Sequence, residues 1–262
     1  MIRVGINGAG VIGRRIADAV RLQDDMQLLG IAKVNPDYKA RLLVDKGIDL
    51  YGADAESVNK MDRANLHPFG TVKDLANKVD VMVDATPGDV GASNISIYKS
   101  AGCKGILQGG EDHAITDLSF VARCNFDQAI GKQYIRVVSC NTTALCRILF
   151  AIDSNFHVDK ARVVIARRAT DPDDSKKGPI DSVSLDPVTI PSHHGPDVET
   201  VLPKLKVISI AYKIPTTHMH LHSLILSLKE AASETQVSEK LKEDNRIMLV
   251  NSKSGFKSTS DL

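Results

Sequence analysis

The chain has 262 residues and 43% of them are hydrophobic, so it is long enough for two domains with real cores and too apolar to be disordered. Lysine and arginine together number 33 and aspartate and glutamate 32, and the net charge of +1 excludes the strongly basic surface that binds nucleic acid. Tryptophan is absent and aromatic residues are few, which also argues against a surface on which bases stack.

Neither a membrane span nor a secretion signal is visible in the sequence. No apolar run approaches the ~18 residues that a span requires, and no charged segment precedes a long apolar stretch at the start. We therefore expect a cytoplasmic protein with no membrane partner. The four cysteines, at positions 103, 124, 140 and 146, form no CxxC pair, so free thiols are expected in a reducing compartment.

The first half of the chain alternates strand-like and helix-like segments. Apolar runs predict strands over residues 1–8, 26–34, 80–88, 104–110 and 134–140, and helical spacing predicts helices over 8–20, 39–48 and 93–102. Such alternation predicts parallel βαβ units and therefore an α/β fold with a doubly wound Rossmann sheet. We place this domain at residues 1–139.

The pattern changes near residue 140. A helix is predicted over 142–153 and strands over 161–169, 206–214 and 218–228, and we expect the last two strands to pair antiparallel. A loop is predicted from Thr170 to about Leu202, where five of the chain's ten prolines lie, and long loops of this kind are usually functional. These segments predict a second, α+β domain at residues 140–262 with a mostly antiparallel sheet.

The last residues have an unusual pattern. Residues 245–250 read as a further strand, and the chain then ends on Ser258-Thr259-Ser260-Asp261, which is typical of a helix start. A frayed tail is the ordinary interpretation, but we expect instead that the C-terminal segment is truncated.

The segment Gly8-Ala9-Gly10-Val11-Ile12-Gly13 fits GxGxxG between a predicted strand and a predicted helix. In this context Gly8 permits a tight turn, Gly10 lets a pyrophosphate approach the backbone, and Gly13 lets helix and strand pack closely. The start of the helix supplies free N–H groups for phosphates. The alternative is a glycine-rich turn that binds nothing.

The residue at the end of the second strand discriminates between the two nicotinamide cofactors. NAD sites usually carry an acidic residue there to hold the ribose 2′-hydroxyl, but this chain has Lys33. A cation attracts a 2′-phosphate, so the sequence favours NADP, although Asp37 could weaken the preference and a solvated lysine is the alternative.

Cys140 is predicted at a strand-to-helix junction, where the N–H groups of the helix start stabilise a thiolate. Thiolate is the reactive form of cysteine. The alternative is a buried structural thiol, but a thiolate combined with a nicotinamide is the apparatus that oxidises an aldehyde.

His218, His220 and His222 alternate, so on a strand all three would share one face. Neighbours on that face lie about 7 Å apart, from a rise of ~3.3 Å per residue, which is too far for three ligands of one zinc ion. We therefore predict no metal site and one functional histidine, His220.

Two further pairs of side chains suit phosphate binding. His193 and His194 precede Gly195-Pro196 in a polar loop, which is typical of an anion contact. Arg167 and Arg168 end a strand, so only one guanidinium can face the site, where it could bind a phosphate bidentately. Solvated side chains are the alternative for both pairs.

Seven segments, in order and at natural spacings along the whole chain, together resemble archaeal-type (type II) glyceraldehyde-3-phosphate dehydrogenase. They are GINGAGVIGRR, VDATPG, QGGE, VVSCNTT, RRATDP, PSHHGPD and PTTHMHLHS. The resemblance implies a homotetrameric enzyme of glycolysis and gluconeogenesis with a Rossmann domain and a catalytic domain, in which Cys140 is the catalytic cysteine and His220 the catalytic base. The cofactor contacts that it implies are Val11, Ile12, Lys33, Gly110 and Arg168, and the substrate contacts are Ser139, Asn141, His194 and Gly195.

The sequence departs from the family in two places. Family members commonly have leucine where this chain has His218, and they continue well past Leu262. The later part of the family's chain includes the helix that returns to the Rossmann domain and a polar contact to the nicotinamide, which is why we expect truncation.

Together these residues predict an oxidation through a cysteine thioester. Cys140 attacks the aldehyde of glyceraldehyde 3-phosphate, His220 takes the hydroxyl proton as general base, and a hydride passes to the nicotinamide. Inorganic phosphate then attacks the thioester and releases 1,3-bisphosphoglycerate. Backbone N–H groups at the helix start, and the Asn141 side chain, would stabilise the oxyanion, while His194 and Arg167 or Arg168 would hold phosphates.

Two alternatives remain open. One is another cysteine-dependent acyl-phosphate reductase, such as aspartate-semialdehyde dehydrogenase, which would not be expected to carry PSHHGPD. The other is a non-catalytic dinucleotide-binding fragment, made plausible by the short C-terminus.

Overall fold

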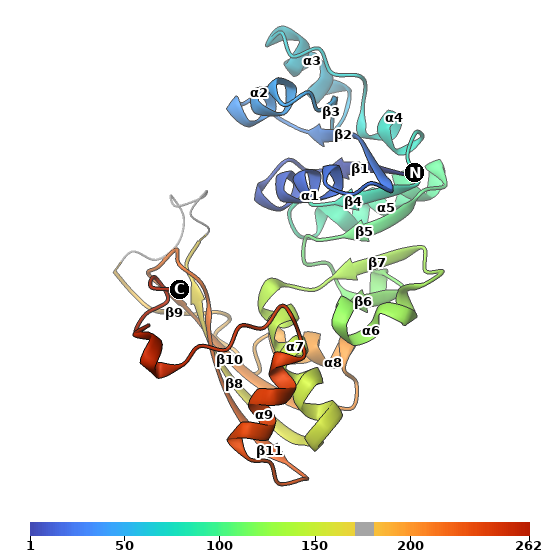
Figure 1. Ribbon diagram of the computed structural model, residues 1–262. Coiled ribbons are helices and arrows are strands. Elements are labelled where there is room, and N and C mark those ends of the chain that lie inside the picture. The colour runs from blue at the N-terminus through green and yellow to red at the C-terminus, as the bar shows by residue number, and fades with distance from the viewer. Residues whose placement is uncertain (171–180) are drawn as a thin grey trace. The chain divides into compact units, whose positions relative to one another are not determined.

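The computed structural model describes residues 1–170 and 181–262, which form two compact units. The first unit contains residues 1–120 and 127–137, and the second contains residues 121–126 and 138–262. Figure 1 shows each unit as one sheet with helices packed on it. No helix of the described residues is both long and apolar enough to cross a membrane.

The first unit is built on a seven-stranded sheet in the order β3-β2-β1-β4-β5-β7-β6, and every pairing is parallel. This Rossmann topology confirms the predicted fold class. The strands are β1 (Ile2–Asn7), β2 (Met26–Lys33), β3 (Leu50–Gly52), β4 (Val81–Asp84), β5 (Lys104–Leu107), β6 (Leu118–Phe120) and β7 (Tyr134–Val137).

Helices cover both faces of this sheet because its central strands are apolar on both sides. Val4 and Ile6 of β1 belong to one buried cluster together with Ala17 and Leu43, and Met82 of β4 belongs to another. The helices are α1 (Val11–Arg21), α2 (Tyr38–Asp45), α3 (Ala55–Arg63), α4 (Val72–Ala76) and α5 (Val90–Ala101), with the short 3₁₀ helix η1 (His113–Ile115). Helix α6 (Ala122–Ala129) is kinked at Asn125, and its residues up to Phe126 belong to the second unit.

The second unit contains a mixed four-stranded sheet in the order β11-β8-β10-β9. Strand β8 (Val158–Arg168) is central and pairs parallel with β10 (Val207–Ile214) and antiparallel with β11 (Leu221–Leu228). Strand β9 (Ser184–Leu185) pairs antiparallel with β10. The helices are α7 (Cys140–Phe156), α8 (His194–Val201) and α9 (Glu234–Lys242), followed by η3 (Ser252–Ser254).

The two faces of this sheet differ. The inner face carries Val163 and Ile165 of β8, which pack with Leu149 of α7 and Val198 of α8 in one buried cluster. The outer face carries exposed apolar side chains beside polar ones such as Arg162. Its residues Val164, Ile208 and Ile225 are 44%, 55% and 69% exposed.

Three predictions about the second unit are wrong in detail. Strands β10 and β11 do not pair with each other, because β8 lies between them. The predicted strand over residues 245–250 does not form. The predicted loop from Thr170 to Leu202 contains β9 and α8, and residues 171–180 of it lie outside the described residues.

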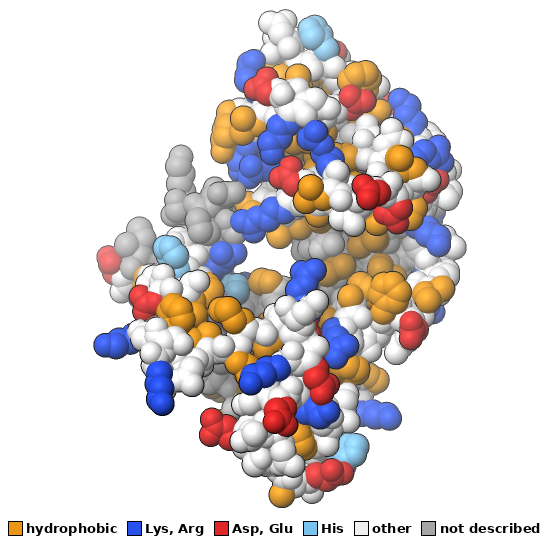
Figure 2. Space-filling model, viewed as in Figure 1, with side chains coloured by type: hydrophobic (Ala, Val, Ile, Leu, Met, Phe, Trp, Pro, Cys, Tyr) orange, Lys and Arg blue, Asp and Glu red, His pale blue; other side chains and the backbone are white. Residues whose placement is uncertain are grey.

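Acidic and basic side chains are interspersed over the surface. Figure 2 shows blue and red groups mixed over the visible face of each unit. This mixture is what a net charge of +1, from 33 basic and 32 acidic residues, leads one to expect.

Candidate active site

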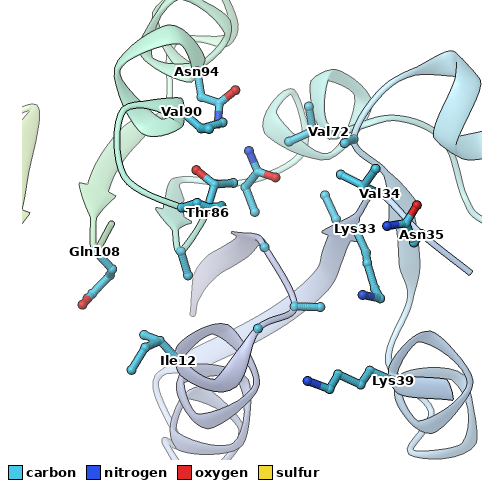
Figure 3. Close-up of a pocket in the computed structure, with 18 of the residues that line it drawn as sticks. Ile12, Lys33, Val34, Asn35, Lys39, Val72, Thr86, Val90, Asn94 and Gln108 are labelled. Carbon is cyan, nitrogen blue, oxygen red and sulfur yellow. The ribbon is translucent and has the colours of Figure 1, made fainter. Parts of the chain in front are cut away.

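The first unit contains a cavity of about 680 Å³ at the carboxyl ends of β1, β2 and β4, the edge where open α/β sheets bind ligands (Figure 3). Six of the residues predicted from the sequence line it or pack directly beneath it. Gly8, Gly10, Val11, Ile12 and Lys33 line the cavity, whereas Gly13 packs below.

The glycines of the fingerprint have distinct structural roles. Gly8 has a φ of 105°, and a Cβ there would lie 2.6 Å from the Ala85 carbonyl oxygen. A Cβ on Gly13 would lie 1.8 Å from the Gly8 carbonyl oxygen, so only glycine lets α1 pack this closely on β1. A Cβ on Gly10 would meet nothing within 4 Å, so this position leaves open the approach to the start of α1. The cradle therefore fits a pyrophosphate bound at a helix N-terminus.

Two lysines lie at the side of the cavity formed by β2 and α2 (Figure 3). The amino group of Lys33 is 2.9 Å from a carboxylate oxygen of Asp37, so its charge is partly neutralised. Burial alone would raise the pKa of Asp37, but the Lys33 ion pair and the N–H groups of Ala40 and Lys39 lower it overall. Lys39, which the sequence analysis missed, also lines the cavity, and no ion pair of its amino group is found in the described part of the chain.

A buried polar network supports the opposite wall. Asp84, which is fully buried at the end of β4, accepts hydrogen bonds from Thr86, from Asn94 Nδ2 and from the Tyr98 hydroxyl. Asn7 Nδ2 in turn donates to the Tyr98 oxygen over 2.9 Å. Burial, followed by the Asp84 charge, strongly raises the pKa of Tyr98, so it stays protonated and donates. Thr86, Asn94 and Asn7 all line the cavity.

Two residues predicted to touch the cofactor are not among the residues that line the cavity. Gly110 is not among the residues lining the cavity, although Gln108 of the same turn is. Arg168 belongs to the second unit. Their assignments stay predictions.

In the second unit, Cys140 is the first residue of α7 and its side chain is exposed. Ser139 caps this helix, because its hydroxyl accepts a hydrogen bond from the Thr142 N–H over 3.1 Å. The other thiols are less available. Burial raises the pKa of Cys124 to about 11 and raises those of Cys103 and Cys146 as well. Cys140 is therefore the exposed thiol at a helix N-terminus that the sequence predicts.

His220 lies beside Cys140, with its Nε2 atom 3.5 Å from the sulfur. The Arg168 backbone N–H donates to the other ring nitrogen, Nδ1, over 3.0 Å. A backbone N–H can only donate, so Nδ1 carries no proton and the neutral ring is protonated on Nε2, facing the sulfur. Burial, followed by the charges of Arg168 and Arg167, lowers the pKa of His220 to about 4.

The three histidines do not share a strand face as predicted. Strand β11 begins at Leu221, after His218 and His220, and Met219 has a φ of 56°. This left-handed residue breaks the two-residue alternation. His218 is exposed, and only His222 lies within the strand.

His222 makes a contact that the sequence analysis did not foresee. Its Nε2 atom lies 2.8 Å from Oδ1 of Asn141, the second residue of α7. Asn141 is only 2% exposed. The two residues are far apart along the chain, so no local pattern signals their contact.

Arg167 lies on the inner face of β8, where its guanidinium pairs with Asp186. Burial lowers the pKa of Arg167, and the charge of Cys140 opposes this shift. Lys213, opposite Arg167 on β10, also contacts Asp186 at 3.3 Å. Arg167 and Lys213 thus share one carboxylate, and the sequence analysis identified only Arg167.

His194 and Gly195 begin α8. The His194 ring is fully buried, with Nδ1 3.2 Å from the Ser192 hydroxyl and no partner for Nε2 among the described residues. Burial, followed by the charge of His193, lowers its pKa to about 3, so the ring contacts any ligand in its neutral form. The Gly195 N–H already donates to Ser209 Oγ, and a Cβ there would lie 2.5 Å from a β10 carbonyl, so packing explains this glycine.

Comparisons with known proteins identify the family to which the chain belongs. The profile of the family described as "Glyceraldehyde 3-phosphate dehydrogenase, C-terminal domain" matches residues 139–257. The glyceraldehyde-3-phosphate dehydrogenase of Methanoregula boonei is 47% identical over 262 residues, which are 100% of this chain and 76% of that protein. The enzymes of the same name from Archaeoglobus fulgidus and Thermococcus kodakarensis are 46% and 45% identical, covering 99% and 100% of this chain and 76% and 77% of their own lengths.

Proposed function

The chain belongs to the glyceraldehyde-3-phosphate dehydrogenase family, and we propose that it catalyses the phosphorylating oxidation of glyceraldehyde 3-phosphate to 1,3-bisphosphoglycerate. The observation that carries this proposal is the 3.5 Å contact between the exposed Cys140 thiol and His220 at the start of α7. A bound nicotinamide dinucleotide, for which the first unit has a fitting cradle, would supply the hydride acceptor.

Cys140 is the nucleophile. Its sulfur forms a bond to the aldehyde carbon, and the carbonyl oxygen becomes an alkoxide. When the hydride leaves, the same carbon becomes a thioester carbonyl. Attack by inorganic phosphate then breaks the carbon–sulfur bond and restores the thiolate.

His220 acts beside the reacting oxygen. A general base would need an unprotonated Nε2, but the Arg168 N–H bond leaves the neutral ring with its proton on that atom. We therefore replace the predicted base role with a donor role, in which Nε2–H stabilises first the thiolate and then the alkoxide. The thiol proton of Cys140 passes to solvent before the attack, and the thiolate then adds to the aldehyde and gives the alkoxide directly, so His220 has no proton to abstract.

Phosphate groups bind beside the thiol through Arg167 and Lys213, which Asp186 holds together. Arg167 provides a planar donor pair for phosphate oxygens, and Lys213 adds a second positive charge. His194 contributes its unpartnered Nε2 atom. Ser139 and Asn141 are the remaining predicted substrate contacts.

The function is tested by following reduced cofactor at 340 nm with glyceraldehyde 3-phosphate, phosphate and NADP or NAD. We expect turnover that needs phosphate or arsenate, and none with aspartate semialdehyde. Turnover with aspartate semialdehyde alone would favour the acyl-phosphate reductase alternative. Absence of turnover with both aldehydes, in a folded chain that binds the dinucleotide, would favour the non-catalytic alternative.

NADP is the preferred cofactor in this proposal because two lysines lie where the adenosine ribose is expected. Replacing Lys39 with glutamine should weaken NADP binding about tenfold, as expected for the loss of one charge-assisted contact of ~1.4 kcal/mol. NAD, which lacks the 2′-phosphate, should bind as before. Isothermal titration of both cofactors measures the difference.

Lys33→Gln should act in the same direction but less strongly, because Asp37 already neutralises part of its charge. Lys46→Gln is the matched control, since Lys46 is an exposed lysine that pairs with Asp18 and does not line the cavity. Equal losses for NADP and NAD in the Lys39 variant would show that this lysine does not select the cofactor.

The proposal includes a homotetrameric, cytoplasmic enzyme. The open face of the second sheet supports self-association, since Ile225 and Ile208 flank Arg162 on neighbouring strands and are 69% and 55% exposed. Sedimentation velocity measures the subunit number.

A further inference from the structure

We infer that His222 is a positioning residue of this active site: it holds the Asn141 side chain so that an amide N–H group is available to the reacting oxygen at Cys140. The inference rests on the proposed function and extends it to a histidine that the sequence analysis left without a role.

The hydrogen bond between His222 and Asn141 can fix the Asn141 side chain, because the His222 ring is itself held in place. His222 lies on β11 opposite Ile165, which is fully buried on the inner face of β8. The ring is therefore anchored on the core side of the sheet. From there its Nε2 atom reaches Oδ1 of Asn141 at 2.8 Å, and Asn141 directly follows Cys140.

The amide oxygen that faces the ring then fixes the tautomer of His222. The Oδ1 atom can only accept, so the His222 proton lies on Nε2. Burial lowers the pKa of His222, and the neutral ring keeps its one proton in this bond. Among the described residues, the Asn141 side chain makes its hydrogen bond through Oδ1, and no partner of its Nδ2 group is found.

An amide N–H held in this way acts on the chemical step. The oxygen of an aldehyde bonded to the Cys140 sulfur gains negative charge, and a donor fixed beforehand stabilises that charge without reorganising. If His222 is lost, the amide can rotate and present its oxygen to the alkoxide, which repels it. The loss should therefore appear in kcat, with little change in KM.

The test compares two amide side chains of different reach. In His222→Gln the Nε2 amide group ends where the ring Nε2 lies and can still donate to Asn141. In His222→Asn the shorter amide cannot reach. We expect His222→Asn to lower kcat about 10- to 100-fold, somewhat less than deletion of a whole oxyanion donor, and His222→Gln to retain most activity. The exposed His218→Gln is the control.

A double-mutant cycle completes the test. If His222 acts through Asn141, then adding His222→Asn to Asn141→Ala should cause no further loss of kcat. A double variant whose loss of kcat equals the product of the two single losses would overturn the inference. Equal losses of kcat in His222→Gln and His222→Asn would also overturn it. A rise in KM alone would also overturn it. The reaction rate of Cys140 with iodoacetamide should stay within about twofold in every His222 variant, because the thiol itself is unaltered.

An independent readout separates this inference from the proposed function. In the ¹⁵N spectrum of the histidine rings, His222 should be protonated on Nε2 in the wild type and should lose this preference in Asn141→Ala. A wild type with this signature but no aldehyde turnover would contradict the function alone. A His222 ring protonated on Nδ1 would contradict the inference alone.

Discussion

Replacing Cys140 with serine is expected to reduce turnover of glyceraldehyde 3-phosphate by at least about 10³-fold, because a serine hydroxyl is a far weaker nucleophile than a thiolate when no strong base lies beside it. His220 does not provide that base, since its Nε2 atom carries a proton in the geometry described. A steady-state assay with saturating cofactor and phosphate measures the loss.

The control for this variant is cofactor binding. The dinucleotide cradle lies wholly in the first unit, so NADP should bind Cys140→Ser as it binds the wild type. Iodoacetamide should label the wild type once, at Cys140, because burial raises the pKa of the other three thiols. Cys124→Ser is the matched thiol control. Unchanged turnover in Cys140→Ser would refute the thioester mechanism.

A pair of substitutions at His220 should have the second-largest effect. His220→Ala removes the group that faces the sulfur and should lower kcat about 10²- to 10³-fold, the usual cost of one oxyanion donor. His220→Gln places an amide N–H near the position of Nε2 and should recover activity to within about tenfold of the wild type. Glutamine can donate there but cannot act as a base.

This pair decides between the donor role and the base role. Were His220 a general base, glutamine and alanine would be equally poor. The fall of kcat at acid pH gives a second check. Because the pKa of His220 is near 4, its ring stays neutral across the usual assay range, and its titration should not contribute to that fall. The charged or titratable groups that act on it are Arg167, Arg168, Cys140 and His222, so an acid limb that survives in His220→Gln must arise from another group.

Much of the first unit could be predicted from sequence because its signals are local. Buried parallel strands are short apolar runs, and GxGxxG fixes the turn between β1 and α1. Strands β3 and β6 were missed because each has only three residues. Helix α9 was missed although its capping box, Ser233 with Gln236, is present in the sequence.

The second unit was harder because its order depends on distant pairings. No local pattern in β10 or β11 indicates that β8 lies between them. Their proximity along the chain instead favours pairing of β10 with β11, which does not occur. Proline content also favoured a loop where α8 forms, since Pro196 falls in the first turn of that helix, where proline is tolerated.

Some residues of the candidate site have local sequence signals, and others are brought together only by the fold. Cys140 could be predicted because a helix start is visible in sequence. Lys213 and Asp186 could not, because their meeting with Arg167 depends on the strand register. The His222–Asn141 contact likewise arises only in the folded sheet.

Met219 illustrates how selection can act on a main chain rather than on a side chain. Its φ of 56° turns the chain just before β11, and its side chain is 40% exposed. A left-handed angle costs a residue with a Cβ roughly 1–2 kcal/mol, whereas glycine and asparagine adopt it readily. Evolutionary drift at this position should therefore accept glycine or asparagine and reject valine or isoleucine, although residue 219 itself need never touch a ligand.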